Sequence, residues 1–260
     1  MKGPDSLKAV LVFDLFGSMA HFRKYYTNTS ALTYGFPPRT VLMGIVAAIL
    51  GFERDSYYAE LDRGRFAVAV KTPTRRLLQT VNYVRTKKED LNLLRRLQQV
   101  PGTQTPLEFL LPAGEARSLC FRVFLSHPDT GLVQEAGDRL REGRTCFPLY
   151  LGITECLAAA RFVNIYGTGD YQEVPPGTTV ELASILNVAH LDKIDFSGGK
   201  TLNLVRERAP YSFGAGRTLQ PPIAVVYESS GNPLTAALRV PSYRFSDAAT
   251  GDEEMVAFLE

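Results

Sequence analysis

Residues 37–51 read PPRTVLMGIVAAILG and predict the first helix of the chain. Proline is favoured at the start of a helix and glycine just past its end, so the stretch predicts a helix that opens at Pro38 and ends at Gly51. The side chains between them are apolar nearly all round, which is typical of a core helix. Upstream, residues 7–14 read LKAVLVFD and predict a buried strand that precedes this helix.

The following residues continue this alternation of strands and helices. An amphipathic helix is predicted over residues 132–142, with Gly143 as its stop. Further strands are predicted over residues 66–70, 119–125 and 161–166. The order β, α, β, insertion, β, α, β is the split βαβ pattern of ferredoxin-like domains, shared by RNA-recognition (RRM-like) domains. The sequence therefore predicts an α+β, ferredoxin-like palm over residues 1–166.

An insertion interrupts this palm at about residues 72–110. Residues 77–84 and 105–111 have strand character, and Thr86-x-x-Glu89 has the spacing of a capping box that opens a short helix. We therefore expect a basic β-hairpin that carries a helix.

The remaining residues have a different character. Residues 167–245 hold short strands, many turns and two Gly-rich loops, which predicts a smaller β-rich C-terminal part. Residues 246–260 carry five acids and no base. We interpret this last stretch as a solvated acidic tail.

Several classes of protein are disfavoured by the composition. The longest apolar run, residues 41–52, is too short to cross a membrane. Residues 1–8 lack the apolar core of a signal peptide. The thiols Cys120, Cys146 and Cys156 are scattered in apolar contexts, as expected of reduced core cysteines. We expect a cytoplasmic globular protein without a disulfide.

Motifs for cofactors and catalysis fail on their spacing. Residues 199–201 read GKT, like the end of a phosphate-binding loop, but Ile194 stands where that pattern needs a glycine. Residues 214–216 read GAG, but Leu219 replaces the third glycine of a dinucleotide fingerprint. The three histidines are isolated from one another in sequence. We therefore expect no metal and no other cofactor.

Positive charge is concentrated in the insertion. Residues 71–96 hold eight bases and two acids, a net charge of +6, in a chain whose net charge is +2. Gln79, Asn82 and Tyr83 stand among these bases. Cations attract phosphates, and flat rings and amides bind unpaired bases, so this mixture is typical of single-stranded RNA binding. Composition alone supports equally well a solvated hairpin whose charges only confer solubility.

Residues 15–37 form a second candidate region. A loop of this length inside a compact domain is usually functional. It contains the cluster Arg23-Lys24-Tyr25-Tyr26, which fits a binding loop beside the first strand. Tyrosines in such turns are also often half-buried packing residues, so both interpretations stay open.

The order of five segments resembles a known family. These segments are residues 13–23 (FDLFGSMAHFR), 34–51 (YGFPPRTVLMGIVAAILG), 79–82 (QTVN), 104–110 (QTPLEFL) and 147–157 (FPLYLGITECL). They resemble the Cas-five family, RAMP-superfamily subunits of the type I CRISPR surveillance complex, Cascade. The similarity extends over about residues 7–227, and the overall pattern is most similar to the type I-B branch.

The resemblance implies a ferredoxin-like palm, a β-hairpin thumb and a variable C-terminal part. It implies a subunit that holds the five-prime handle of the CRISPR RNA, caps the backbone filament and contacts the large subunit near the PAM. The implied partners are that RNA, the Cas-seven-type backbone and Cas-eight-type large subunits, and target DNA near the PAM, with no membrane. The residues expected at the RNA are Phe22, Arg23, Lys24, Tyr25, Tyr34, Arg39, Lys71, Arg75, Arg76, Gln79, Asn82, Tyr83, Arg85, Lys87 and Lys88.

One branch of the family also cleaves precursor RNA without metal. The resemblance associates that activity with a tyrosine in the loop before the first helix and an adjacent Lys-His pair. Tyr34 matches the first element, but no Lys-His dipeptide occurs in the chain. Acid–base cleavage needs such groups near the 2′-hydroxyl, so we expect a non-catalytic RNA clamp. A metal-independent endoribonuclease and a protein scaffold without RNA contact remain the alternatives.

Overall fold

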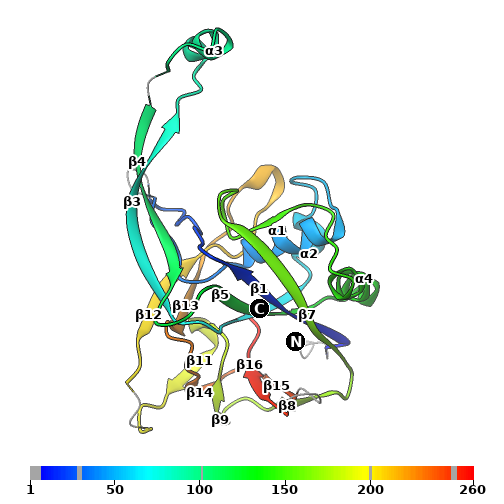
Figure 1. Ribbon diagram of the computed structural model, residues 1–260. Helices are drawn as coiled ribbons and strands as arrows, with labels where there is room; N and C mark the ends of the chain where they lie inside the picture. The colour runs from blue at the N-terminus through cyan, green and yellow to red at the C-terminus, as the bar shows by residue number, and fades with distance from the viewer. Residues whose placement is uncertain (1–6, 28–30, 101, 199–200, 247–250) are drawn as a thin grey trace.

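The fold was analysed in a computed structural model that describes residues 7–27, 31–100, 102–198, 201–246 and 251–260. It is a mixed α+β structure built mostly of strands (Figure 1). Residues 199 and 200 of the GKT stretch lie outside the described residues, as do residues 28–30 of the loop over residues 15–37. No helix in the described ranges is long and apolar enough to span a membrane.

A five-stranded sheet of order β2-β5-β1-β7-β6 forms the centre of the body. Every pair in it is antiparallel, and β5 lies between β1 and β2. The elements follow the predicted order, with a short helix and a short strand added. The strands are β1 (Ala9–Gly17), β2 (Arg65–Val70), β5 (Leu119–Ser126), β6 (Leu149–Tyr150) and β7 (Leu157–Gly167).

The helices of the body are α1 (Arg39–Leu50), α2 (Tyr58–Leu61) and α4 (Thr130–Arg141). The predicted ends of α1 are confirmed, because Pro38 is its N-cap and Gly51 its C-cap. Gly51 has φ +88°, a left-handed conformation that glycine adopts without steric cost, and its N–H donates to the Ala47 carbonyl.

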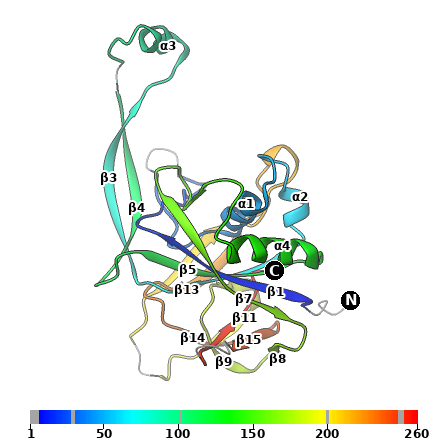
Figure 2. The same ribbon diagram turned by 45° about the vertical axis from the view of Figure 1, so that its right-hand side comes forward.

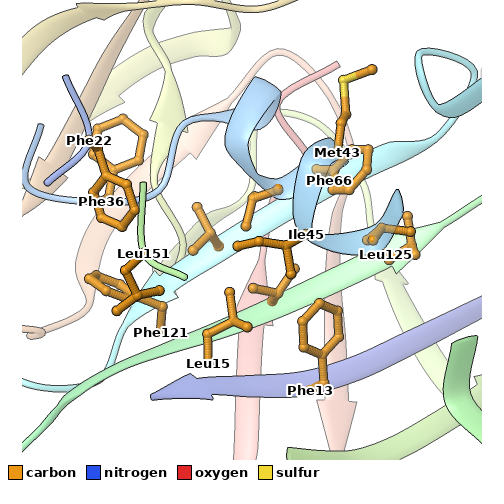
Figure 3. Packing of buried hydrophobic residues seen from close by; sticks show 14 of the residues in the cluster. Phe13, Leu15, Phe22, Phe36, Met43, Ile45, Phe66, Phe121, Leu125 and Leu151 are labelled. Carbon is orange, nitrogen blue, oxygen red and sulfur yellow. The ribbon is translucent and has the colours of Figure 1, made fainter. Parts of the chain in front are cut away.

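Both faces of β1, in the interior of the central sheet, are buried. Leu11, Phe13 and Leu15 of β1 belong to the large core that includes the apolar side chains of α1 and α4. Figure 3 shows Phe13 and Leu15 in this core, together with Met43 and Ile45 of α1. The alternate residues Val10 and Val12 pack on the opposite face, in a second core formed with the last strands of the chain. This alternation follows from the period of two in a strand, and it explains why both faces of β1 carry apolar side chains.

The C-terminal part forms three small sheets, of orders β10-β13-β12, β11-β14-β9 and β16-β15-β8. Ala209, Val225 and Tyr227 from this part lie in the same core cluster as Phe13. The two parts therefore share apolar packing. The strands are β8 (Tyr171–Val174), β9 (Thr179–Leu182), β10 (Leu186–Asn187), β11 (Leu191–Ile194), β12 (Leu204–Ala209), β13 (Ile223–Glu228), β14 (Leu234–Leu238), β15 (Ser242–Ser246) and β16 (Glu253–Val256), with short 3-10 turns at Val188–His190 and Ala215–Arg217.

The interpretation of residues 246–260 as a solvated tail is wrong. β16 pairs with β15, and Val256 and Phe258 are buried against the central sheet. The side chain of Glu260 accepts a hydrogen bond from the backbone N–H of Phe66 at 2.9 Å. The acidic residues of this segment suggested that it is exposed to solvent. The five residues from Met255 to Leu259 are apolar and buried, and their burial holds the segment against the body.

The insertion forms a two-stranded hairpin of β3 (Thr74–Val84) and β4 (Gly102–Pro112), with the helix α3 (Lys88–Arg95) at its tip. Its ladder runs from Thr74 opposite Pro112 to Val84 opposite Gly102. In two views the hairpin projects away from the body and carries α3 at its far end (Figures 1 and 2). We call this segment, residues 72–112, the thumb.

Candidate nucleic-acid interface

The base of the thumb is attached to the loop that follows β1. Ala20 forms a β-bridge with Leu110, and Ala31 forms another with Leu107. The Nδ1 of His21 lies 2.7 Å from the carbonyl oxygen of Glu108. Burial lowers the pKa of His21 below its ordinary value and outweighs the opposing effect of this hydrogen bond. The two candidate regions of the sequence are therefore neighbours in space.

A buried carboxylate joins the same loop and the thumb to the C-terminal part. Oε1 of Glu207, on β12, lies 2.7 Å from Nζ of Lys24 and 2.9 Å from a guanidinium nitrogen of Arg76. Oε2 of Glu207 is buried and has no hydrogen-bond partner among the described residues. Burial tends to lower the pKa of Arg76, but Glu207 raises it above the ordinary value. Lys24 and Arg76, both predicted at the RNA, are therefore paired with a carboxylate of the protein itself.

Three other predicted contact residues are in the core. Phe22, Tyr34 and Arg39 are at most 1% exposed. The Tyr34 hydroxyl donates to the carbonyl oxygen of Arg208 at 2.7 Å, and burial raises its pKa. The prediction that these three side chains face RNA is wrong for the structure described, because the loop that holds Phe22 and Tyr34 folds inward and Arg39 lies at the buried start of α1.

Arg39 is buried because the fold provides partners for its charge. Its guanidinium pairs with Asp62 at 2.6 Å and with Glu260 at 2.5 Å, and donates to the Gly64 carbonyl at 2.9 Å. Burial tends to lower the pKa of Arg39, but Glu260 is foremost among the groups that raise it. Glu260 lies 221 positions away in sequence, so local sequence offered no sign of this pairing.

The remaining cations of residues 71–96 divide into paired and unpaired groups. Lys71 pairs with Glu254, and Arg85 pairs with Asp90 at 2.7 Å. Within the part of the chain that the structure describes, no ion pair engages the other five, which are Arg75, Lys87, Lys88, Arg95 and Arg96. These exposed cations are concentrated on β3 and around α3.

The start of α3 differs from the prediction. Lys87 is the N-cap, and no side-chain hydrogen bond caps the helix, so the expected capping box of Thr86 and Glu89 is absent. Asp90 is instead 2% exposed, and its carboxylate accepts two hydrogen bonds from Arg85. This ion pair holds the first turn of α3 against the end of β3.

The polar and aromatic groups of the stem are exposed as expected. Gln79, Asn82 and Tyr83 all lie on β3 and are exposed. Because side chains alternate between the faces of a strand, Gln79 and Tyr83 share one face with Arg75, while Asn82 lies on the other. The former face combines a free cation, an amide and a ring that is 37% exposed.

A groove of about 800 Å³ lies beside the thumb base, and sequence reasoning did not predict it. Its floor is the outer face of α1, where Gly44 and Ala48 leave space, and Arg23 and Tyr25 line it as well. Tyr25 is 41% exposed and packs edge-on against Tyr26, with ring centroids 5.1 Å apart. Further aromatic side chains line the groove, namely Phe52, Tyr57, Tyr58, Phe147, Tyr150 and Phe213.

Sequence signals for this groove were present but incomplete. Phe147 and Tyr150 lie in the segment FPLYLGITECL, whose pattern contributed to the family resemblance. Its other wall comes from two loops, residues 52–58 and 210–219, that reach the groove only through the fold. Among the described residues, no group of three His, Cys, Asp or Glu side chains is arranged to hold a metal ion.

The fold is that of CRISPR-associated proteins. A "CRISPR RNA-guided surveillance complex" chain aligns with a TM-score of 0.53 at 15% identity, covering 86% of this chain and 91% of that one. A "CRISPR protein from Archaeoglobus fulgidus" aligns with a TM-score of 0.54 at 12% identity, covering 95% and 99%. No curated protein matches the sequence.

Within that class the sequence identifies the family. Residues 10–195 match the model of the family described as "CRISPR-associated protein (Cas_Cas5)". The chain belongs to this Cas5 family, and the family predicted from its sequence segments is confirmed.

Proposed function

We propose that this protein is a non-catalytic RNA-binding subunit of a type I CRISPR surveillance complex. In this proposal a ferredoxin-like palm and its thumb grip the five-prime handle of the guide RNA and cap the backbone filament. The neighbouring subunits are of the Cas-seven and Cas-eight types, with target DNA near the PAM. Membership of the Cas5 family supports this setting, as does the fold shared with a chain of a CRISPR RNA-guided surveillance complex.

One observation carries the proposal: the thumb projects from the body and presents an unpaired arginine and an exposed tyrosine on one face of β3. Arg75 and Tyr83 lie on the same face of β3, and both are exposed. Guanidinium groups neutralise phosphates, and aromatic rings stack on unpaired bases whatever their sequence. A hairpin whose charges served solubility alone would have no need for this arrangement of a cation, an amide and a ring on one face.

The groove supports a second point of contact. It opens next to Arg23 and Tyr25, at the foot of the thumb, and its aromatic walls suit unstacked bases. An RNA strand that follows the Arg75 face of the thumb toward the body would enter this groove. Phe22, Tyr34 and Arg39 then act behind the surface, by fixing the loop and α1, and Lys24 and Arg76 act by anchoring the thumb.

The non-catalytic part of the proposal is supported by the position of Tyr34. Its hydroxyl is buried and donates to a backbone carbonyl, and its raised pKa disfavours a phenolate. A general base must lie within hydrogen-bond reach of the proton that it removes. Tyr34 cannot reach a 2′-hydroxyl on the surface without unfolding of its loop.

The experiment compares charge reversal on the thumb and on the body, in the assembled complex. The thumb variant is Arg75→Glu, Lys87→Glu, Lys88→Glu, and the matched control reverses the exposed body residues Lys8, Arg117 and Lys193. The thumb variant is expected to lose guide RNA and to reduce the slope of log affinity against log salt by about 0.7 for each phosphate contact removed. Equal RNA retention in both variants would reject the thumb as the RNA-binding element.

A separate measurement tests the absence of catalysis. Purified protein is incubated with repeat RNA in EDTA, and the RNA is expected to remain intact. Specific cleavage that disappears in Tyr34→Phe would replace this proposal with a metal-independent endoribonuclease.

A further inference from the structure

The two strands of the thumb are attached to the body in different ways. β4 is held along its outer edge by the backbone, where Leu110 exchanges hydrogen bonds of 2.8 and 2.9 Å with Ala20. No strand among the described residues pairs with the outer edge of β3, and the N–H of Thr74 donates to a body carbonyl only at 3.4 Å. The side chain of Arg76 instead ties β3 to Glu207 of β12, at 2.9 Å. The β3 side of the thumb therefore depends on a side-chain ion pair.

This ion pair also determines which way the faces of β3 point. Side chains alternate along a strand, so Arg76 lies on the face opposite to Arg75 and Tyr83. Because Arg76 is directed at Glu207, the face with Arg75 and Tyr83 is turned away from β12. Rotation of the hairpin about its β4 attachment would swing β3 away from β12 and turn this face. The pair of Arg76 and Glu207 opposes that rotation.

The polar cluster around Glu207 is only partly satisfied. Oε1 of Glu207 accepts from both Lys24 and Arg76, while Oε2 is buried and has no hydrogen-bond partner among the described residues. Tyr227 lies on the same face of the neighbouring strand β13, and its buried hydroxyl also lacks a partner among them. Burial, and after it the charge of Glu207, raises the pKa of Tyr227, so this phenol stays neutral.

Stability alone does not account for such a cluster. Buried polar atoms without a hydrogen bond lower the free energy of unfolding. Apolar side chains of similar volume in place of a buried ion pair are often neutral or stabilising, whereas a charged group restricts the geometry of its partners. Glu207 has two cationic partners, one on the loop and one on β3, and both are far from it in sequence. The geometry that it imposes is that of the thumb on the body.

We propose that Glu207 is a positioning residue, which fixes the rotation of the thumb about its β4 attachment by holding Arg76. The consequence for RNA rests on the proposed function: Arg75 and Tyr83 are held facing one way before RNA arrives. Binding then does not include the entropic cost of orienting the hairpin. Lys24 holds the loop to the same carboxylate but does not set this rotation, because Phe22 and Tyr34 bury the loop independently.

An apolar replacement of the whole cluster separates positioning from stability. The variant is Lys24→Met, Arg76→Met, Glu207→Leu, which leaves no buried charge without a partner. Its melting temperature is expected to stay unchanged or to rise. Encoded spin-label amino acids at the exposed positions Asn92 on α3 and Gln172 on β8 report the orientation of the thumb in the free protein by double electron–electron resonance. The parent is expected to give one narrow distance distribution and the variant a broad one. Equally narrow distributions would overturn the inference.

Two single variants form the matched comparison and cover the case in which the triple variant does not fold. Arg76→Met leaves Glu207 paired with Lys24 and is expected to broaden the distribution. Lys24→Met leaves the pair of Arg76 and Glu207 in place and is expected to keep it narrow. Equal broadening in both, or none in Arg76→Met, would show that Glu207 does not position the thumb through Arg76.

RNA affinity distinguishes this inference from the proposed function. In the assembled complex, the dissociation constant for guide RNA is expected to rise about tenfold in Arg76→Met, because the orientation must then be fixed during binding. Lys24→Met is expected to bind like the parent. A broadened distribution together with parental RNA affinity would leave the role of Glu207 standing and would count against the proposed function alone.

Discussion

The loop over residues 15–37 and the thumb contain similar residues but differ in how many of them are buried. Both combine cations with tyrosines, and the sequence predicted both as RNA contacts. The structure buries Tyr34 and Lys24 of the loop and leaves Arg75 and Tyr83 of the thumb exposed. The two regions meet at the thumb base, where Glu207 holds one cation from each.

The difference shows that residue type does not decide whether a cation is available to a ligand. A charge taken out of water requires a partner of opposite charge, so each buried cation of the loop has a carboxylate. The thumb has only two strands and cannot form an apolar core of its own, so most side chains of β3 stay exposed on both faces. A cation that is buried and paired with a carboxylate stabilises the fold and is not available to bind a ligand.

The comparison is sharpest at Arg39 and Arg75. Arg39→Ala leaves the carboxylate of Glu260 in the core without its partner, so the free energy of unfolding is expected to fall by about 3–5 kcal/mol. Arg75→Ala, on the exposed thumb, is expected to change it by less than about 0.5 kcal/mol. Urea denaturation of the two variants measures both values. Similar losses would contradict the division between structural and available cations.

Asp14 offers a pH test of the buried region. Burial raises its pKa, but Arg122 and Arg161, at 2.8 and 3.0 Å, outweigh this and hold the pKa below its ordinary value. The unfolded chain therefore binds the proton more tightly, so this stabilisation is complete above pH about 4 and is lost as pH falls through the lower, folded pKa.

The matched variant is Asp14→Asn, which cannot titrate. The difference in unfolding free energy between the parent and this variant is expected to shrink as pH is lowered from 6 to 3, as measured by denaturation at each pH. The effect is expected to be smaller than for Arg39→Ala because Arg122 retains Glu254 as a second partner at 2.8 Å. A difference that stayed constant with pH would show that Asp14 has an ordinary pKa.

Tyr83 tests the exposed region. Tyr83→Ala removes a stacking surface and is expected to weaken RNA binding by about 1–3 kcal/mol for each base stacked, with no loss of stability. Val84→Ala, at the next position on the opposite face, is the control and is expected to leave RNA affinity unchanged. Filter binding with the assembled complex measures both. Equal affinities of Tyr83→Ala and the parent would mean that the ring contacts no base.

The smallest effect is expected at Tyr34. Tyr34→Phe removes one buried hydrogen bond to the carbonyl of Arg208 and is expected to cost about 1 kcal/mol of stability. Tyr25→Phe, in the exposed part of the same loop, is expected to cost nothing measurable. Thermal unfolding compares them. A larger effect of Tyr25→Phe would reverse the assignment of which tyrosine is structural.

Local sequence determined the elements and their order. The bounds of α1 follow from Pro38 and Gly51, whose backbone preferences need no long-range contact. The run of apolar residues in β1 predicted a buried strand, and the structure buries both of its faces. The family also followed from short segments, because their spacing along the chain is itself sequence information.

The tertiary structure decided which of the candidate residues remain available. The partner of Lys24 lies 183 positions away and that of Arg39 lies 221 positions away, so no local pattern could show that these cations are paired. The acids of residues 252–260 suggested solvent, yet the apolar side chains beside them bury the segment. A charged side chain can be buried only where the fold places a group of opposite charge beside it, because an unpaired charge is stable only in water.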